Sequence, residues 1–353
     1  MKFTKVEFQS IQNATEFQID EDTCLTDTNE AMLNKSILKQ PLKTVSLFTG
    51  CGGSDRGLID AGCEILMAND ILAYAKDVYE ANLPETDFKT DSIDQIKTFP
   101  AADVLAGCYP CQGYCQGGAR DTGRKVNILY REFDRALRKI RPKVFIVENV
   151  SGMARSDNRH FLNAQLVRFR LAGYRVTWDF INAAEYGLAQ ERRRIFIVGI
   201  RSDFGVKYQF PKPTHGPGLK PIKTQREVLK DLEEEWPQGE FCDQDFHWYY
   251  LSRDRYRGWD EPSKTVLANA RHMPLHPMSP PLKKIGTDQW VFEGDPKKAR
   301  RLSYKEAAAL QDLGGWKFPD TAGLMSKYKV IGNAVPPMIF RQIFEALPEE
   351  VFS

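Results

Sequence analysis

TVSLFTGCGGSDRG, residues 44–57, is a short apolar run that leads directly into a glycine-dense turn. An apolar run of this length, bounded by turn residues, is typical of a buried strand. Gly50, Gly52 and Gly53 let the backbone after this strand approach a ligand closely. Because they do not continue the GxGxxG spacing that holds a pyrophosphate, a cofactor without phosphates fits this turn better.

Three further apolar runs follow along the chain, and helical patterns lie between them. The runs are ADVLAG (102–107), KVFIVENV (143–150) and RRIFIVGI (193–200). DILAYAKDVYEANL (70–83) and ILYREFDRALRKI (128–140) repeat apolar residues three or four positions apart, as helices do. Alternating strands and helices predict a mostly parallel, Rossmann-like α/β sheet.

Composition narrows the class of protein. The chain has 353 residues, of which 42% are hydrophobic, so it can bury a substantial core. Its seven cysteines are an odd number and do not have the spacing of a small secreted scaffold, which favours reduced thiols. Because it has neither a run of about 18 apolar residues nor a signal-peptide core, we expect a cytoplasmic protein without a membrane partner.

Charge is unevenly distributed although the net charge is only +2. Residues 120–143 contain nine Lys or Arg against three Asp or Glu, whereas residues 1–40 contain four basic against seven acidic residues. The basic stretch could face phosphate groups. It could equally be the solvated face of an amphipathic helix, and charge alone leaves both interpretations open.

The composition changes after Arg201. PKPTHGPGLKP and an acidic segment are followed by an aromatic and arginine-rich stretch from Phe246 to Arg271, which indicates a second, smaller domain. Helical patterning returns in SYKEAAALQDL (303–313), where Ser303 and Glu306 form a plausible capping box.

Four separated motifs carry a family resemblance. Cys111 follows Pro110 in ADVLAGCYPCQGYCQGG (102–118), ENV spans residues 148–150, QERRR spans 190–194, and YKVIGNAVPP spans 328–337. Together with the glycine turn, and in this order, they resemble the cytosine-C5 DNA methyltransferases. The resemblance covers roughly residues 44–341. It departs from the family at Cys108 and Cys115, where glycine and serine are usual.

The resemblance implies a reaction and assigns its residues. The Cys111 thiolate would add to C6 of a flipped-out cytosine, so that C5 can attack the methyl group of S-adenosylmethionine. Glu148 would serve N3 of the ring, while Arg192 and Arg194 would flank the base near O2. The alternative is that Glu148 and the two arginines form a structural ion pair.

The resemblance also places the cofactor. Asp70 would bind the ribose hydroxyls and Asp91 the adenine amino group, although Asp70 could instead be the N-cap of the following helix. The cofactor-binding residues implied are Phe48, Gly50, Gly52, Gly53, Asp70, Asp91, Pro110, Asn333 and Val335.

Double-stranded DNA is the partner implied, because an arginine-rich region can read guanine in the major groove. Arg253, Arg255 and Arg271 match the recognition region of members that methylate GGCC, so a GGCC-like target is a hypothesis. Base flipping is required because the target atom lies inside the duplex. We expect a monomer that is associated with the nucleoid through its binding to DNA. A restriction endonuclease is expected as a genetic partner only.

The expected organisation has three parts: an N-terminal extension (1–42), a catalytic domain (43–201 with 325–353) and a target-recognition domain with its connecting segment (202–324). Three alternatives stay open at this point. They are an RNA cytosine-C5 methyltransferase, a catalytically silent DNA-binding protein, and a metal protein built on Cys108, Cys111 and Cys115. We expect no metal, since a fourth ligand at suitable spacing is missing.

Overall fold

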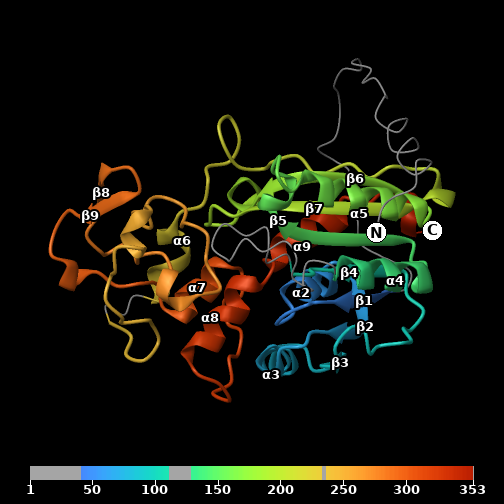
Figure 1. The fold of residues 1–353 in the computed structure, drawn as a ribbon, viewed down its shortest axis with the longest axis horizontal. Helices are drawn as coiled ribbons and strands as arrows, with labels where there is room; N and C mark the ends of the chain where they lie inside the picture. The colour runs from blue at the N-terminus through green and yellow to red at the C-terminus, as the bar shows by residue number, and fades with distance from the viewer. Residues whose placement is uncertain (1–40, 111–128, 233–235, 353) are drawn as a thin grey trace. The chain divides into compact units, whose positions relative to one another are not determined.

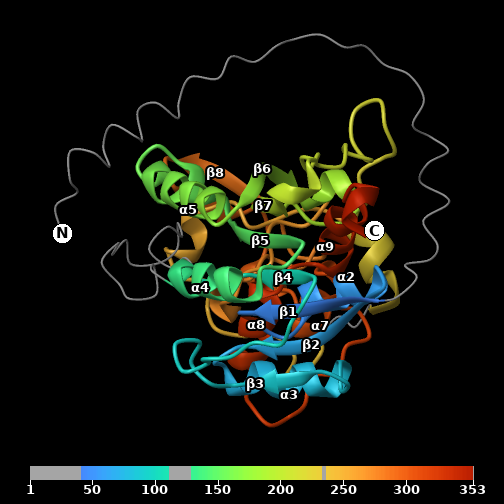
Figure 2. The ribbon, with the colours of Figure 1, turned by 90° about the vertical axis from the view of Figure 1, so that its right-hand side faces the viewer.

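The computed structural model describes residues 41–110, 129–232 and 236–352, and these residues belong to one compact unit. A seven-stranded sheet with the order β3-β2-β1-β4-β5-β7-β6 organises it (Figures 1 and 2). The strands are β1 (Leu42–Leu47), β2 (Cys63–Asn69), β3 (Asp87–Lys89), β4 (Val104–Gly107), β5 (Val144–Val150), β6 (Tyr174–Asn182) and β7 (Arg193–Arg201).

Strand direction confirms a mostly parallel sheet. β1 pairs in parallel with β2 and β4, β2 with β3, and β4 with β5. β7 pairs antiparallel with both β5 and β6, so it alone runs against the other strands of this sheet. The carboxyl ends of β1, β2, β4 and β5 therefore meet at one edge, where ligands bind in open α/β sheets.

Helices cover both faces of the sheet. α4 (Tyr130–Ile140) and α5 (Arg159–Leu171) lie on one face, and α2 (Gly53–Asp60) and α9 (Pro337–Glu345) lie on the other (Figure 2). α3 (Ala73–Asn82) lies near the β3 edge. Helix α9 comes from the end of the chain, so the C-terminal segment packs on the sheet beside α2.

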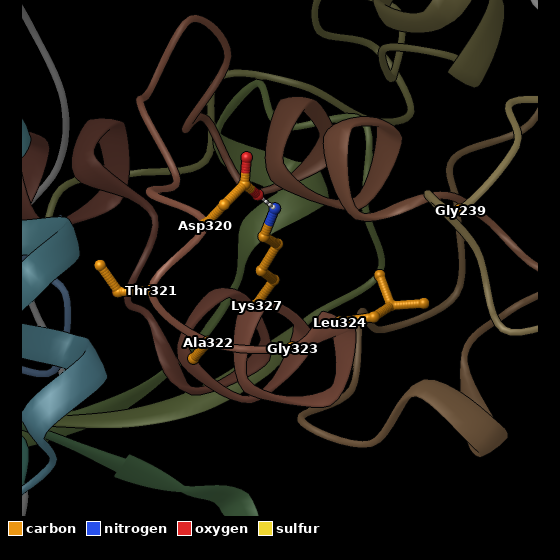
Figure 3. A pocket seen from close by; sticks show the side chains of 7 residues that line it. All are labelled: Gly239, Asp320, Thr321, Ala322, Gly323, Leu324 and Lys327. Carbon is orange, nitrogen blue, oxygen red and sulfur yellow. Dashed lines mark hydrogen bonds and ion pairs between the residues drawn. The ribbon is translucent and has the colours of Figure 1, made fainter.

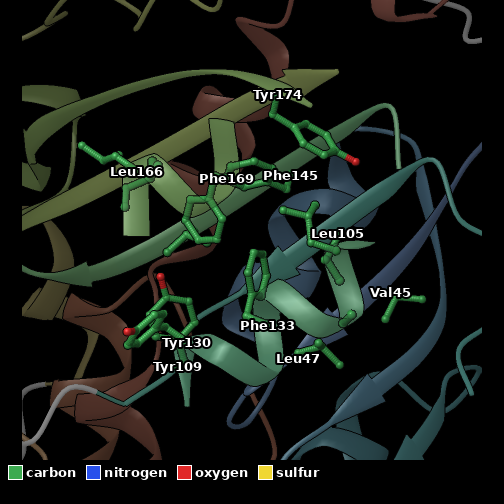
Figure 4. Close-up of a cluster of buried hydrophobic side chains, with 14 of the residues drawn as sticks. Val45, Leu47, Leu105, Tyr109, Tyr130, Phe133, Phe145, Leu166, Phe169 and Tyr174 are labelled. Atoms are coloured by element: carbon green, nitrogen blue, oxygen red, sulfur yellow. The ribbon is translucent and has the colours of Figure 1, made fainter. Parts of the chain in front are cut away.

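The core between the sheet and the α4–α5 face is aromatic. Phe133, Phe145 and Phe169 are fully buried, and Tyr109 and Tyr174 lie at opposite ends of the same cluster (Figure 4). Phe145 packs on Phe169 with ring centroids 4.8 Å apart. This packing fixes the helices against the strands that carry the candidate site.

The charged face of α4 is engaged within the fold. Arg138 Nε lies 3.1 Å from the buried carboxylate of Asp134, and Arg168 of α5 pairs with the same carboxylate. Arg135 pairs with Glu132 at 2.7 Å. In the described part of the basic stretch, these charges therefore serve the helix and its neighbour. Residues 120–128 lie outside the described residues.

The region after Arg201 has little regular structure. It contains α6 (Gln225–Leu229), a hairpin of β8 (Leu282–Gly286) and β9 (Gln289–Phe292), α7 (Tyr304–Leu310) and α8 (Leu324–Asn333). Ser303 and Glu306 form the predicted capping box at the start of α7. Across the described residues, every helix is too short or too polar to cross a membrane.

Two hydrophobic clusters organise this region. A small one, built on Tyr250, Leu275 and Leu282, contains only residues of 246–299. A larger one joins Val266 and Met273 to residues of α3, α7 and α8. The region thus has a core of its own and a second core that it shares with the sheet domain.

Candidate active site

The turn after β1 presents backbone at the edge of the sheet. Phe48 and Gly50 have positive φ angles of 58° and 59°, and Gly52 has 98°. A Cβ atom on Gly52 would lie 2.7 Å from the Tyr79 ring, so both conformation and space require glycine there. The Thr49 N–H donates to the Asn69 carbonyl at 3.1 Å and joins this turn to the end of β2.

Asp70 and Asp91 are brought together beside this turn. The Asn69 side-chain amide donates to the carbonyls of Lys89 and Asp91, both at 2.9 Å. Asp70 accepts the Gly50 N–H on Oδ2 and the Leu72 N–H on Oδ1, each at 2.9 Å. Burial raises the pKa of the Asp70 carboxyl, and these backbone donors oppose that rise.

The N-cap alternative for Asp70 does not match the structure. The N-cap of α3 is Leu72, and Asp70 lies two residues before it. Ile71, between them, has an exposed fraction of 66%, which is unusual for isoleucine. An exposed apolar side chain next to the Asp70 carboxylate is a candidate contact for a purine ring. Sequence periodicity could not reveal it, because the exposure depends on tertiary packing.

The C-terminal segment closes on the glycine turn from the other side. A Cβ atom on Gly53 would lie 2.2 Å from the Val335 carbonyl oxygen, so the two backbones are in direct contact. Asn333, at the end of α8, is exposed, whereas Val335 is buried. The predicted cofactor residues from Phe48 to Gly53 and from Asn333 to Val335 therefore come from two adjoining segments.

Glu148 has a buried carboxylate at the carboxyl end of β5. Its residue exposure is 7%, and Arg194 Nε of β7 lies 3.1 Å from its Oε1. The N–H direction does not make this contact a hydrogen bond, so Oε1 has no hydrogen-bond partner among the described residues. Burial raises the pKa of this carboxyl, and Arg194 and Arg192 oppose the rise. A raised pKa suits a group that holds a proton for a substrate.

Arg192 makes backbone contacts that the motif did not indicate. Its guanidinium donates to the backbone carbonyls of Val266 at 3.4 Å, Gly332 at 3.2 Å and Ala334 at 2.9 Å. Its Nε is buried without a hydrogen-bond partner among the described residues, and Arg192 lines a small pocket with Glu148 and Arg194. Arg192 thus ties Val266, in the region after Arg201, and the C-terminal segment to the start of β7.

The chain that leads to Cys111 leaves the sheet after β4. The Cys108 N–H donates to the Leu47 carbonyl at 3.2 Å, and the Asn149 amide donates to the Tyr109 carbonyl at 3.1 Å. Burial raises the pKa of the Cys108 thiol well above its usual range, so Cys108 is a poor nucleophile. Cys111 and Cys115, the other two cysteines of this segment, lie outside the described residues.

The three predicted recognition arginines differ in exposure. Arg253 and Arg271 are exposed. Arg255 has an exposed fraction of only 8%, with Nε donating to the Tyr250 carbonyl at 3.1 Å and one Nη donating to the His272 carbonyl at 2.9 Å. Arg255 therefore supports the stretch that presents the other two.

Sequence patterns missed an aromatic surface next to these arginines. Trp248 has an exposed fraction of 80% and meets Tyr249 edge to face at 5.7 Å, and the Tyr249 ring lies 5.1 Å from His272. Burial and then the charges of Arg255, Arg301, Arg253 and Arg271 lower the pKa of His272. The run HWYY (247–250) does not indicate which ring faces outward. Tertiary packing decides this, and it buries Tyr250, which is 3% exposed.

A cavity of about 450 Å³ lies beside the start of α8, away from Glu148 (Figure 3). Asp320 and Lys327 line it, and they pair at 2.6 Å. Lys327 also lies 4.5 Å from the centre of the Tyr304 ring. Because the two charges are matched to each other, this cavity shows no chemistry of its own.

The fold and the site together define a class of protein. Open α/β sheets bind their ligands at the carboxyl ends of the strands, and a buried acid with a raised pKa at that edge, as Glu148 is, indicates an enzyme. Within that class the family is shown by comparison. The C-5 cytosine-specific DNA methylase family matches residues 42–349, so the chain belongs to this family and is a DNA (cytosine-5-)-methyltransferase. This confirms the resemblance drawn from the motifs.

Curated relatives extend the match over most of the chain. The type II methyltransferase M.BsuRI of Bacillus subtilis is 35% identical over 343 residues, covering 86% of this chain and 78% of the relative. M.NgoPII of Neisseria gonorrhoeae is 34% identical, covering 87% and 95%. These type II relatives place the chain among restriction-modification methyltransferases.

Solved structures share the fold. A Spodoptera frugiperda DNMT2 variant superposes with a TM-score of 0.64 at 16% identity, covering 86% of this chain and 99% of that one. The Dnmt2 methyltransferase of S. pombe gives a TM-score of 0.63 at 15% identity, covering 87% and 98%.

Proposed function

We propose that Cys111 is the nucleophile of this methyltransferase and that Glu148 and Arg194 serve the opposite edge of the cytosine. The observation that carries the proposal is the buried Glu148 carboxylate, whose Oε1 lacks a hydrogen-bond partner among the described residues. Asn149, the next residue, holds the Tyr109 carbonyl at 3.1 Å. The acid and the chain that leads to Cys111 are therefore tied together at adjacent strand ends.

The chemistry follows from these positions. A Cys111 sulfur lone pair forms a bond to C6 and moves electron density through the ring toward N3 and O2. Glu148, with its raised pKa, gives a proton to N3, and the Arg194 cation stabilises charge at O2. C5 then forms a bond to the methyl group that the donor sulfonium would release, and a base takes the C5 proton. Elimination breaks the sulfur–C6 bond and restores the Cys111 thiolate, and the N3 proton returns to Glu148. We leave that base unassigned.

The proposed donor is S-adenosylmethionine, which would supply an electrophilic methyl group. The residues present fit it, because backbone at Gly50–Gly53, the carboxylates of Asp70 and Asp91 and the exposed Ile71 adjoin at one sheet edge. Asp70 would bind ribose hydroxyls, Asp91 the adenine amino group, and Ile71 the purine face. The residues proposed to hold it are Phe48, Gly50, Gly52, Gly53, Asp70, Ile71, Asp91, Pro110, Asn333 and Val335.

We propose that Arg253 and Arg271 read guanine in a short duplex site, with a GGCC-like sequence as the specific hypothesis. Both side chains are exposed, and arginine forks match guanine O6 and N7. The buried Arg255 fixes the backbone near them by donating to the carbonyls of Tyr250 and His272. Trp248 adds an aromatic contact to DNA, since indoles stack on bases and the nearby arginines attract phosphate.

Changing Trp248 to Ala tests the aromatic contact. We expect duplex affinity to fall about five- to hundredfold, because stacking contributes about 1–3 kcal/mol per base. Fluorescence anisotropy with a labelled target duplex measures this. Trp236→Ala is the matched control, because Trp236 is 41% exposed next to the acidic segment. Equal affinities of the Trp248 variant and the wild type would remove Trp248 from the interface.

The wider organisation is also a proposal. Residues 43–201 with 325–353 form the catalytic domain, and residues 202–324 form the recognition domain with its connecting segment. The small core around Tyr250 supports the recognition domain, whereas the cluster shared with α3 ties it closely to the sheet. We propose a monomer that acts on chromosomal DNA in the cytoplasm, paired genetically with a restriction endonuclease.

Methyl transfer from labelled S-adenosylmethionine to mixed-sequence duplex DNA, followed by base-resolution mapping, tests the proposal. We expect C5 methylation at one short site, abolished in Cys111→Ala and kept in Cys108→Ala. Duplexes that differ only in the central four base pairs test the GGCC-like hypothesis, which equal activity on all of them would remove. Transfer to structured RNA but not to DNA would contradict the proposed substrate.

A further inference from the structure

Tyr109 is fixed at both its backbone and its hydroxyl group. The residue is 4% exposed, and its carbonyl accepts the Asn149 amide N–H at 3.1 Å. Its hydroxyl donates to Gln165 Oε1 at 2.5 Å, and Gln165, on α5, is 2% exposed. Tyr109, directly before Pro110, is therefore fixed to Asn149 through its carbonyl and to Gln165 through its hydroxyl.

The surroundings of Tyr109 belong to the site. Its ring meets Phe48 of the glycine turn at 6.1 Å and Phe133 of α4 at 5.6 Å. The Gln165 amide lies 3.9 Å from the Met153 sulfur, in the 3-10 turn (Ser151–Ala154) that follows Glu148 and Asn149. One side chain thus contacts the cofactor turn and, through Gln165, the segment after the acid.

Packing alone does not explain the hydroxyl. A phenylalanine ring at this position would make the same contacts with Phe48 and Phe133. The hydroxyl adds a directional bond to a buried acceptor, which sets the depth and rotation of the ring. Because Tyr109 lies two residues before Cys111, a displaced ring would shift the point at which the chain leaves the sheet.

We propose that Tyr109, through its bond to Gln165, is a positioning residue for the Cys111 nucleophile. The inference rests on the proposed role of Cys111. It assigns Tyr109 and Gln165 an effect on the rate of sulfur–C6 bond formation and little effect on DNA binding. Figure 4 shows Tyr109 at the end of the aromatic cluster opposite Tyr174.

The experiment measures how fast the full-length protein, supplied with S-adenosylmethionine so that C5 can be methylated, is captured by a duplex that carries 5-fluorocytosine at the target position. Fluorine cannot leave as the C5 proton does, so the covalent adduct accumulates. We expect Tyr109→Phe and Gln165→Leu to slow capture at least about tenfold, with duplex affinity within about twofold of wild type. Gln165→Glu keeps an acceptor for the hydroxyl and should stay within about threefold.

Tyr174→Phe is the matched control. Tyr174 is 3% exposed in the same cluster, and its hydroxyl donates to the Pro142 carbonyl at 2.9 Å, at the opposite end of β5. Capture by Tyr109→Phe or Gln165→Leu within twofold of wild type overturns the inference. An equal slowing by Tyr174→Phe does so too, because the effect would then reflect general core stability. If Cys111→Ala still forms the adduct, the proposed nucleophile itself is wrong.

Discussion

The surroundings of Glu148 disfavour the ionised form of its carboxyl group. Burial raises its pKa, and the Arg194 contact at 3.1 Å is not aligned as a hydrogen bond. A buried acceptor without a hydrogen-bond partner is destabilising, and such groups are concentrated at functional sites. A ring nitrogen that shares a proton with Oε1 would relieve this arrangement.

Replacing Glu148 with Gln tests that interpretation. The amide cannot give a proton to N3, so we expect the single-turnover methylation rate to fall about hundredfold or more. The unfolding midpoint should change little, because Gln has the same shape. Glu191→Gln is the control, since Glu191 is a partly exposed partner of Arg257 at 3.5 Å. A Glu148 variant within fivefold of the wild-type rate would argue for a purely structural ion pair.

At the scale of elements, the site depends on the contact between α2 and the segment that follows α8. Gly53 is the first residue of α2, and a Cβ atom there would lie 2.2 Å from the Val335 carbonyl oxygen. Backbone cannot move aside as a side chain can. The glycine turn and Val335 therefore keep their relative position only while residue 53 has no side chain.

Gly53→Ala is expected to lower the free energy of unfolding by about 1–3 kcal/mol through overpacking. Affinity for S-adenosylmethionine should fall with it, because the turn and Val335 are forced apart. Chemical denaturation and calorimetric titration measure the two effects. Gly314→Ala is the control, with its nearest atom 3.9 Å from the added Cβ. Equal stability and donor affinity in both variants would show that the turn has room to adjust.

The imidazole of His276, buried beside Glu306 of α7, should make the free energy of unfolding depend on pH. His276 Nε2 lies 3.6 Å from Glu306, whose carboxylate is already paired with Arg300 at 2.8 Å. Burial, with Arg300, lowers the pKa of His276 from 6.5 to about 3. A group whose pKa falls on folding stabilises the protein above its unfolded pKa, and this is lost as pH decreases toward the folded value.

Between pH 7 and pH 5, His276 should therefore remove about 2 kcal/mol from the free energy of unfolding. Urea denaturation at both pH values measures the loss, and His276→Gln should lack it. Carboxylates whose pKa rises on folding, such as Glu148, increase the free energy of unfolding as the pH falls. The His276 variant is therefore compared with the wild type at each pH. His247→Gln, at an exposed position, should behave like wild type. A His276 variant with the wild-type pH dependence would contradict the buried neutral imidazole.

At the scale of the whole described unit, Arg192 connects three segments that are distant in sequence. Its guanidinium, one residue before β7, reaches the carbonyls of Val266, Gly332 and Ala334. The Val266 N–H also donates to the side-chain amide oxygen of Gln190 at 2.9 Å. The region after Arg201 and the C-terminal segment are therefore held by the residues directly before the strand that carries Arg194.

Arg192→Lys keeps the charge but cannot reach three carbonyls with a planar fork. We expect unfolding free energy to fall by about 2–4 kcal/mol, because buried carbonyls lose their donors. Affinities for DNA and for S-adenosylmethionine should fall together. Arg193→Lys is the control, since its guanidinium lies over the Phe180 ring at 4.2 Å. Loss of DNA affinity alone, with donor affinity intact, would contradict the linking role.

Much of the fold was predictable because its signals are local. The four apolar runs became β1, β4, β5 and β7, and Ser303 and Glu306 formed the capping box because its residues are three apart. The reversed direction of β7 was not predictable, since apolar runs carry no direction. The exposure of Ile71 and Trp248 and the burial of Arg255 depend on tertiary packing, which motif matching does not specify.

The site was predictable where family motifs name chemistry, and less so where one residue has two roles. Glu148 and Arg194 lie 3.1 Å apart, a contact that fits both the family resemblance and the structural ion pair. Arg192 was expected beside the base, but its carbonyl contacts could not be read from its position in QERRR, because the partners lie 74 to 142 residues away. Cys111 lies outside the described residues, so its role stays a prediction.

The most direct test of the central claim identifies the residue that becomes bonded to the target base. Wild-type protein is incubated with S-adenosylmethionine and a 5-fluorocytosine duplex, and the adduct is digested and sequenced by mass spectrometry. We predict that the modified base is attached to Cys111 and that Cys111→Ala forms no adduct while Cys108→Ala does. Attachment at another residue, or methylation of ordinary duplex DNA by Cys111→Ala, would contradict the account.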